Sequence, residues 1–389
     1  MDLHSHLMAL VAPKGDESEV FPGARLKGAS TELGPRLTFE VGGVEVHVEV
    51  APADETQAKR KHAARSRRLL FSYRVDSGGA LDPKVGLALC RAVAALVAER
   101  EDEALAALAR DAEAARSAME GTARIREIRV DRLLEQAGTA GRRYYTLSPY
   151  VGCLIGCRFC YAQQRIADVR RLWALPDVPW GSYVDVRVNA ADILASELDH
   201  LPPAPVKFCP IVSDPYQAVE ARFQITRACL FRLRDARPAW PTLVLTRARL
   251  IERDADVLAS MAIAYAGASI PTIDDEARRH FEPRGASIAE RLATLHALRA
   301  AGVRTFAVVQ PVLPGSIEAL ADVLAAAVSS ARVDVLNGTY GSEAEFSDDR
   351  YSFARSEGWQ RDRAIELREA LTARGVALWE GELPPEMWG

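Results

Sequence analysis

Three cysteines of this 389-residue chain, Cys153, Cys157 and Cys160, lie within eight residues of one another. Their spacing, C-x3-C-x2-C, places three thiolates on one short loop, and thiolates are the ligands that iron–sulfur clusters prefer. A four-iron cluster held by three cysteines keeps one iron without a protein ligand, open to a small chelating molecule. A structural zinc site needs a fourth cysteine or histidine at ligand spacing, and none follows here. The spacing therefore predicts a [4Fe-4S] cluster in preference to zinc.

The nonapeptide that begins at Cys153 and ends at Tyr161, with Phe159 before its last cysteine, resembles the cluster loop of the radical S-adenosylmethionine (SAM) superfamily. In that family the loop binds a [4Fe-4S] cluster, and SAM chelates the open iron. The resemblance implies that Phe159 lies at the cofactors and that SAM is cleaved reductively to a 5′-deoxyadenosyl radical. That radical abstracts a hydrogen atom from a substrate, after a flavodoxin- or ferredoxin-like donor has reduced the cluster.

Composition and charge argue against several other classes of protein. The net charge of −4 and the pI of about 6.1 give no overall attraction to nucleic acid or to an anionic membrane. We expect no membrane contact, because no apolar run reaches the roughly 18 residues of a membrane span and residues 1–13 lack a signal-peptide pattern. Six cysteines with three of them clustered do not form a disulfide framework, which favours the reducing cytoplasm.

The first 143 residues are predicted to form a small α+β domain with an arm before it and a linker after it. Apolar and polar residues alternate on both sides of Gly42-Gly43, which is typical of a hairpin. The basic run at 59–68 is a solvated face or a contact surface for an acidic or polyanionic partner. The predicted parts are a loosely ordered arm over 1–22, a three-stranded domain over 23–120 and a linker over 121–143. Within the domain we expect strands in 37–50 and at 69–75, and a helical stretch over 82–118 that is broken near 100–103.

From Tyr144 onwards, strand and helix signals alternate, which predicts a parallel sheet built from βα units. We expect an α/β fold with a partial (β/α)6 barrel over 144–389, whose chemistry lies at the C-terminal ends of the strands. The expected strands are 144–150, 183–188, 206–212, 242–246, 265–270, 305–309, 333–336 and 376–379, and the expected helices are 163–172, 191–201, 219–237, 255–261, 288–301, 317–330 and 360–374.

Residues at the strand ends narrow the resemblance to the spore photoproduct lyase-like branch of the superfamily. Ser213 and Asp214 stand where the superfamily usually has Gly-Gly-Glu, and the resemblance assigns Asp214 to the ammonium group of SAM. The alternative is that Asp-Pro only starts a turn. Thr246-Arg247 stands where the branch has Thr-Lys, and a guanidinium at Arg247 can bind the SAM carboxylate in a bidentate way.

Two later strand ends and one loop extend the resemblance. Ser269 stands where family members place a polar residue on the ribose hydroxyls, although a serine bonded to backbone explains it equally well. Val312 lies in Gln310–Gly315, the segment that packs on the adenine in the family, where proline and glycine give a fixed, narrow turn. The loop that contains Glu282 and Arg284 resembles the branch, and we expect these two residues to pair and to order it, with substrate contact as a second role.

The other cysteines receive separate interpretations. Cys90 and Cys229 lie in helical apolar patterns and are predicted to be core residues. Cys209 lies on the strand before Ser213. In spore photoproduct lyase a hydrogen-donating cysteine lies near this strand end, and Cys209 is displaced by two residues from the corresponding position, which is roughly 6–7 Å along a strand. Its catalytic role as a hydrogen donor and its burial as a core residue both stay open. No cysteine follows Cys229, so we expect one cluster.

The substrate cannot be derived from these residues, and three hypotheses differ in kind. The first is a peptide or protein, modified after the front domain binds it by strand addition. The second is a lyase-type repair of a nucleic acid lesion, by analogy with the branch. The third is a non-catalytic iron–sulfur sensor, which would leave the polar strand ends at Asp214, Arg247 and Ser269 without a reason.

Overall fold

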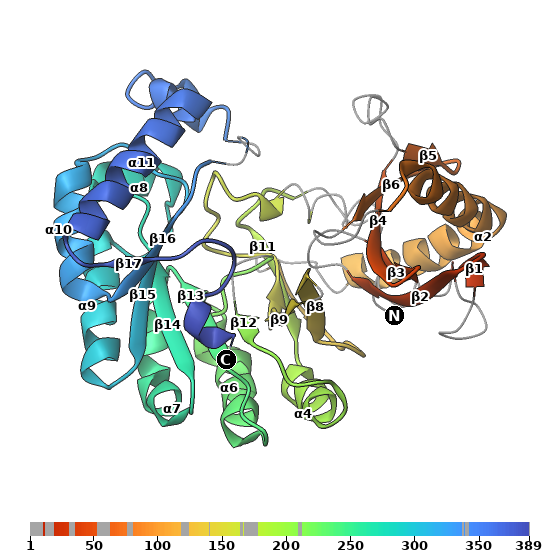
Figure 1. Cartoon of the computed structure of the whole chain (residues 1–389), viewed down its shortest axis with the longest axis horizontal. Helices are drawn as coiled ribbons and strands as arrows, with labels where there is room; N and C mark the ends of the chain where they lie inside the picture. The colour runs from red at the N-terminus through yellow and green to blue at the C-terminus, as the bar shows by residue number, and fades with distance from the viewer. Residues whose placement is uncertain are drawn as a thin grey trace. The chain divides into compact units, whose positions relative to one another are not determined.

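The computed structural model describes residues 19–30, 36–52, 63–75, 81–117, 124–139, 141–163, 178–208, 212–336 and 342–388, and positions 11, 166 and 338. The chain divides into two compact units, both drawn in Figure 1. The front unit comprises residues 1–126, 137–143 and 165–178, and the barrel unit comprises residues 127–136, 144–164 and 179–389.

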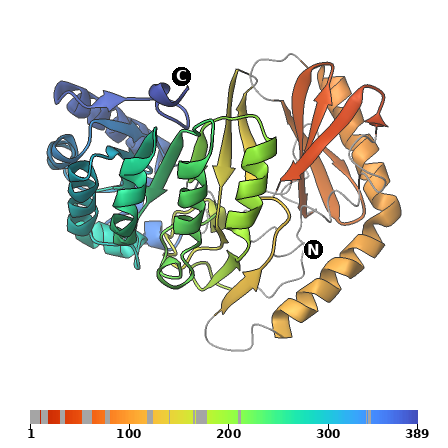
Figure 2. The ribbon, with the colours of Figure 1, turned by 90° about the horizontal axis from the view of Figure 1, so that it is seen from below.

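The front unit is an antiparallel sheet with one long helix on one of its faces (Figure 2). Apolar residues of the helix, among them Leu89, Val93 and Val97, pack with inward-facing residues of the strands such as Phe39 and Phe71. The strand order is β1-β2-β3-β4-β6-β5. The elements are β1 (Glu19–Phe21), β2 (Ala24–Ser30), β3 (Arg36–Val41), β4 (Val44–Pro52), β5 (Ala63–Arg65), β6 (Leu69–Val75) and α2 (Pro83–Ser117).

The predicted hairpin is confirmed, but the predicted number of strands is wrong. β3 and β4 meet at Gly42 and Gly43, whose φ angles of 59° and 81° need glycine in a two-residue turn. Among the described residues the sheet has six strands instead of three. β1 and β5 are only three residues long, which is too short to show an alternating pattern.

Helix α2 runs without interruption through residues 100–103, where the sequence predicted a break. One of the four charged residues there, Glu101, is buried and hydrogen-bonds to the turn between β5 and β6. Its carboxylate accepts hydrogen bonds from the Ser66 hydroxyl at 2.9 Å and from the backbone amides of Arg67 and Arg68, both at 3.2 Å. Glu101 interrupts the apolar pattern of the sequence but not the helix, because its carboxylate is bonded to residues outside α2. Residues 59–62 of the basic run lie outside the described residues.

The stretch predicted as a linker contains strands. β7 (Arg124–Ile128) forms a three-stranded sheet with β10 (Tyr150–Val151) and β11 (Tyr183–Arg187), in the order β10-β11-β7. β8 (Leu134–Thr139) and β9 (Arg142–Leu147) belong to the large sheet. β7 and β8 are short and mix charged with apolar residues, so their sequences show no clear periodicity.

The barrel unit contains a sheet in which the strands follow one another in sequence order. The order is β17-β16-β15-β14-β13-β12-β9-β8, and all neighbours from β9 to β17 are parallel. The predicted α/β barrel fold is confirmed. The elements are β12 (Val206–Phe208), β13 (Thr242–Thr246), β14 (Ala264–Ser269), β15 (Arg304–Val309), β16 (Ser330–Val333), β17 (Ala377–Leu378), α4 (Ala190–His200), α5 (Glu220–Phe223), α6 (Ile225–Asp235), α7 (Ala255–Ser260), α8 (Asp275–Phe281), α9 (Ile288–Ala300), α10 (Ile317–Ala327) and α11 (Glu357–Ala373).

Several helix and strand boundaries differ from the prediction. The single helix expected over 219–237 is two helices, because Gln224 adopts a left-handed φ of 52° between α5 and α6. β16 begins three residues earlier than expected. Helix α8 was missed because its short, charged sequence has no apolar stripe; Asp274 caps it by accepting from the Glu276 and Ala277 amides. Most of the helix expected over 163–172 lies outside the described residues.

An ion pair across the inner face of the sheet shows that the sheet is curled. Lys207 of β12 and Arg332 of β16 both contact Oε2 of Glu382, the latter through Nη1 at 3.2 Å. Four strand spacings separate β12 from β16, which is roughly 19 Å in a flat sheet. Side chains from two strands this far apart can reach one oxygen atom only if the sheet curves around its inner face, as in a partial barrel.

Residues 379–388, which we call the C-terminal strap, cross this inner face (Figure 1). The ring of Trp379 packs edge-on against Phe306 of β15, with centroids 5.5 Å apart. At the other end of the strap, Trp388 packs against Tyr144 of β9 at 6.2 Å. The strap therefore joins both sides of the curled sheet. Among the described helices, none has the length and apolar character needed to cross a membrane.

We predict that Glu382→Gln lowers the melting temperature at pH 7 and that this difference disappears in acid. Lys207, helped by Arg332, holds the pKa of the Glu382 carboxyl down to about 2, against an ordinary value of 4.5. A lowered pKa adds stability above pH 4.5, and this stability is lost as the pH falls towards 2. We expect a cost of about 1–3 kcal/mol at pH 7, below that of a fully buried pair because the Glu382 side chain is 44% exposed.

Thermal unfolding at several pH values measures this effect. Glu380→Gln, an exposed position in the same strap, is the matched control and should leave the melting temperature unchanged. A Glu382→Gln difference that stays constant between pH 7 and pH 2.5 would show that the ion pairs are not its origin.

Candidate functional site

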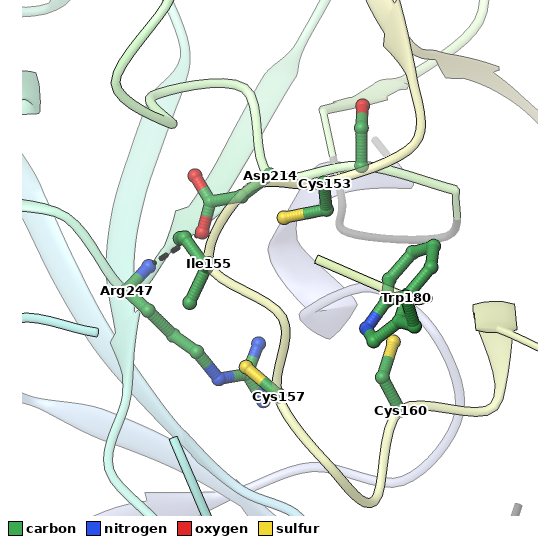
Figure 3. A pocket seen from close by; sticks show the side chains of 8 residues that line it. Cys153, Ile155, Cys157, Cys160, Trp180, Asp214 and Arg247 are labelled. Carbon is green, nitrogen blue, oxygen red and sulfur yellow. Dashed lines mark hydrogen bonds between the residues drawn. The ribbon is translucent and has the colours of Figure 1, made fainter. Parts of the chain in front are cut away.

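The three clustered cysteines line a pocket at the carboxyl ends of β12 and β13 (Figure 3). The empty space of the pocket, including solvent at its mouth, is about 270 Å³. Parallel strands bring their carboxyl ends to one edge, which is why residues far apart in sequence meet here. The lining residues are Cys153, Ile155, Cys157, Cys160, Trp180, Ser213, Asp214 and Arg247.

The thiols of Cys153 and Cys157 are protonated at neutral pH unless a bound cation compensates their charge. Cys153 and Cys157 are buried, and Cys160 is half-buried. Burial raises the pKa of Cys153 to about 12, with a further contribution from the Asp214 carboxylate. Burial also raises the pKa of Cys157 well above 9.0, although Arg247 opposes this. Metal binding to thiolates releases their protons, so iron is a suitable occupant of such a site.

The donor set fits a cluster better than a single ion. Among the described residues, no three His, Cys, Asp or Glu side chains converge on one metal position. Cysteines that each bind a different iron of a cluster need not converge on one point. Three soft thiol groups that line one pocket fit the ligand set expected for a cluster with an open iron.

Buried Gln217 holds the cysteine loop in place. Its Oε1 accepts from the Leu154 amide at 2.8 Å, and its Nε2 donates to the Gly152 carbonyl at 3.0 Å. The Gly152 amide donates in turn to the Val212 carbonyl at 3.1 Å. The sequence analysis gave Gln217 no role. Its position three residues after Asp214, at a polar strand end, was the available signal.

Gly156 and Gly181 let the cysteine loop approach a neighbouring segment. Gly156 has a φ of 64°, and a Cβ added there would lie 2.9 Å from the Gly181 Cα. The Arg284 guanidinium lies over both glycines, 2.5 Å from the same Cβ position. Arg284 was expected to pair with Glu282. In the structure the partners of Glu282 are Arg247 and Arg291, and Arg284 packs on the loop instead.

Asp214 joins the ends of two neighbouring strands. Its Oδ1 accepts from the Thr246 hydroxyl at 2.6 Å and from the Tyr216 amide at 2.9 Å, and its Oδ2 accepts from the Arg247 amide at 2.8 Å. Burial raises the pKa of Asp214, although these hydrogen bonds oppose it. A carboxylate accepts about four hydrogen bonds, so one position remains for a further donor. Its assignment to the SAM ammonium stays a prediction.

The other predicted cofactor residues lie in different surroundings. Ser213 lines the pocket, but its hydroxyl donates to the Tyr150 carbonyl at 2.8 Å. Ser269 is buried at the end of β14, and its hydroxyl has no hydrogen-bond partner among the described residues. Val312 is packed in the core formed with α10 and α11, and its carbonyl accepts from Gln360 at 2.8 Å. The structure thus gathers Ser213 and Asp214 at the pocket but not Val312.

Arg247 is held by a buried carboxylate. Its Nε lies 2.6 Å from Oε1 of Glu282, whose Oε2 lies 2.5 Å from Nη2 of Arg291. Burial raises the pKa of Glu282, but Arg291 and Arg247 outweigh burial and keep it below its ordinary value. The Glu282 Oε1 is also 4.0 Å from the Cys157 sulfur. Glu282 and Arg291 therefore belong to the site, although the sequence analysis did not place Arg291 there.

Aromatic rings support the far side of the cysteine loop. Phe159 is buried, its ring lies 6.3 Å from that of Phe281, and the Arg247 guanidinium carbon is 5.8 Å from its centroid. The Arg158 amide donates to the Phe281 carbonyl at 2.8 Å. Trp180, which the sequence analysis missed, presents its indole to the pocket, and its buried N–H has no partner among the described residues (Figure 3).

The cysteines outside the loop fall into two groups. Cys90 and Cys229 are fully buried in hydrophobic cores, which confirms their prediction as core residues. Cys209, the candidate hydrogen donor, lies outside the described residues.

Comparison with known proteins finds matches to the central part of the chain. A profile of the Radical SAM superfamily matches residues 147–324. An uncharacterized protein of Methanocaldococcus jannaschii is 27% identical over 174 residues, which are 45% of this chain and 62% of that protein. An uncharacterized protein of Mycobacterium tuberculosis is 30% identical over 178 residues, 44% of this chain and 50% of that protein. The chain thus spans about half to three fifths of the length of these curated relatives.

Two solved structures are among those that match parts of this chain. A spore photoproduct lyase mutant matches 65% of this chain and 80% of its own, with 15% identity and a TM-score of 0.48. Streptococcus suis SuiB, crystallised with S-adenosylmethionine, matches 80% of this chain and 56% of its own, with 13% identity and a TM-score of 0.38.

We predict that Gly156→Ala weakens metal loading of the cysteine loop. The left-handed backbone costs alanine roughly 1–2 kcal/mol, and its methyl group would lie too close to Gly181. Iron content and the absorbance near roughly 400 nm, measured after reconstitution, should fall several-fold. Gly358→Ala is the control, because nothing lies within 4 Å of its Cβ position, and it should load as the parent does. Equal loading of both variants would contradict the prediction.

Proposed function

We propose, from the premise that residues 147–324 form a radical SAM domain, that this chain is an enzyme that cleaves SAM reductively and abstracts hydrogen from a substrate. We assign the cluster to Cys153, Cys157 and Cys160. The observation that carries the proposal is the shared pocket, which combines three cysteines with Asp214 and Arg247 from two strand ends.

The cofactors of a radical SAM domain are a [4Fe-4S] cluster and SAM. When bound, they supply an electron-driven cleavage of a sulfur–carbon bond and a 5′-deoxyadenosyl radical. The residues of this chain bind and orient them. Arg247, fixed through its Nε by Glu282, keeps its Nη groups for the SAM carboxylate. Asp214 accepts from the ammonium through its remaining lone pair, and the unpaired Ser269 hydroxyl serves the ribose.

Two features support chemistry that must exclude water. Asp214 and Ser269 are each 1% exposed, and Phe159 with its neighbouring rings closes the loop from behind. A buried wall of this kind strengthens electrostatic contacts and protects a reactive species from solvent. Cys160 and Trp180 are half-buried, so the open side of the pocket is their side. Phe159 completes the proposed cofactor environment, and the loop that contains Val312 would contact the adenine outside the pocket that the cysteines line.

A peptide or protein is the substrate class that we favour over a nucleic acid. The sheet face of the front unit opposite α2 carries charges of both signs, and Lys27 pairs with Glu40 at 2.9 Å. Such a face offers no continuous positive surface for a phosphate backbone. The two described edge strands, β1 and β5, have three residues each, which leaves little room for strand addition. Because Arg36, His47 and Ser72 of this face are buried, we place peptide recognition on its exposed charged residues. The charged residues of this face include Arg25, Lys27, Glu40, Glu45, Glu49 and Arg74.

An electron donor of the flavodoxin or ferredoxin type and a cytoplasmic location complete the proposal. The alternatives are nucleic acid lesion repair by a lyase and a non-catalytic iron–sulfur sensor.

We predict that the reconstituted, dithionite-reduced protein converts SAM to 5′-deoxyadenosine. Cys157→Ala should abolish this conversion and the absorbance near roughly 400 nm, because it removes one of three cluster ligands. Cys229→Ala removes a cysteine of the same unit that lies in the core, and it should retain both signals. An intact cluster without formation of 5′-deoxyadenosine would refute the enzymatic function and favour the non-catalytic iron–sulfur sensor.

We predict that nucleic acid binds weakly and without the steep salt dependence of a phosphate contact surface. Fluorescence anisotropy with labelled DNA between 50 and 200 mM salt, values at which multiple phosphate contacts lose orders of magnitude in affinity, measures this. Tight binding with a steep negative slope would favour the repair alternative.

A further inference from the structure

A buried triad of charges, formed by Arg247, Glu282 and Arg291, lies directly behind the cysteine loop. The side chain of Glu282 is fully buried, that of Arg291 is 1% exposed and that of Arg247 is 11% exposed. Glu282 bridges the two guanidinium groups, at 2.6 Å and 2.5 Å. Each member comes from a different segment: Arg247 follows β13, Glu282 follows α8 and Arg291 lies in α9.

Arg291 is anchored by backbone carbonyls rather than by a second acid. Its Nη1 donates to the Ser269 carbonyl at 2.7 Å, and its Nε donates to the Ala286 carbonyl at 2.9 Å. The nearby carboxylate of Asp214 bonds the backbone amide of Arg247, not its guanidinium. Two guanidinium groups and one carboxylate give the triad a net charge of +1, held away from water.

The triad contacts a predicted cluster ligand. Oε1 of Glu282 is 4.0 Å from the Cys157 sulfur, and Arg247 lines the same pocket as the three cysteines (Figure 3). A buried positive charge favours nearby anions more strongly than an exposed one, because little solvent screens it. A four-iron cluster on three thiolates is anionic, and its reduction adds one more negative charge. Net charge and hydrogen bonds near such clusters are known determinants of their potential.

We infer that the Arg247–Glu282–Arg291 triad is the counter-charge that sets the reduction potential of the cluster. The inference rests on the proposed function, because it requires a cluster on Cys153, Cys157 and Cys160. Glu282 and Arg291 are positioning residues: they act through Arg247 and Cys157 and touch neither SAM nor substrate. The net +1 raises the potential, so that a biological one-electron carrier can reduce the site.

Two single variants change the buried charge in opposite directions. Glu282→Gln removes the negative charge and keeps the shape, so the net charge becomes +2 and the potential should rise. Arg291→Gln removes one positive charge, so the net charge becomes 0 and the potential should fall. Arg291→Lys keeps the charge and should stay near the parent value. A redox titration of the reconstituted cluster, followed by absorbance near roughly 400 nm and by electron paramagnetic resonance, measures these shifts without turnover.

A purely structural role gives a different pattern. Loosening the loop would admit water, and Glu282→Gln and Arg291→Gln would then shift the potential in the same direction, which would overturn the inference. Arg253→Gln is the control: Arg253 pairs with buried Glu220 at 2.6 Å, outside the residues that line the pocket, and it should leave the potential unchanged.

Loss of the cluster in a variant is also informative. If Arg291→Gln holds no cluster while Arg291→Lys does, the charge at this position is required, which supports the inference. If both hold none, packing at this position decides, and the inference is wrong. If the parent protein holds no cluster, the proposed function fails first, so the two failures are distinguishable.

Discussion

The backbone of the cysteine loop belongs to no helix, and buried side chains and distant carbonyls must therefore satisfy its polar groups. Gln217 supplies both a donor and an acceptor, and the carbonyls of Val212 and Phe281 accept from Gly152 and Arg158. A buried amide without a partner costs roughly 1–3 kcal/mol, so this arrangement leaves few alternatives for the loop. The Cys160 amide adds a hydrogen bond to the Cys157 carbonyl at 3.2 Å, so the positions of the three sulfurs depend on bonds within the loop as well as on bonds to distant residues.

Charge organises the same region at longer range. Asp214 connects β12's end to β13, and Glu282 connects β13's end to α9. Each carboxylate thus stands between consecutive βα units at the pocket edge. The sequential strand order makes this possible, because neighbours in sequence are neighbours in the sheet. Two carboxylates thus connect three consecutive parts of the barrel unit beside the pocket.

Periodicity predicted the barrel well, because strands buried on both faces carry strong apolar runs, as in Thr242–Thr246 and Arg304–Val309. Periodicity gave the strand ends, and the resemblance to the radical SAM superfamily singled out Asp214 and Arg247 there, both of which line the pocket. It missed Trp180 and Arg291, since neither follows a strand, and their roles depend on side-chain direction. The expected Glu282–Arg284 pair was wrong as well, because closeness in sequence suggested it while the partners of Glu282 lie in other segments.

The C-terminal strap affects the order in which the barrel can be completed during synthesis. Lys207 and Glu382 are separated by 175 positions, and a ribosome adds about 5–20 residues per second, so roughly 9–35 s pass between the synthesis of one partner and the other. During that interval the inner face of β12 carries a cation without its carboxylate. The barrel strands can pair progressively as they emerge, but their common interior is sealed last. Nascent chains of this protein are therefore most exposed to chaperones and proteases through the inside of the barrel.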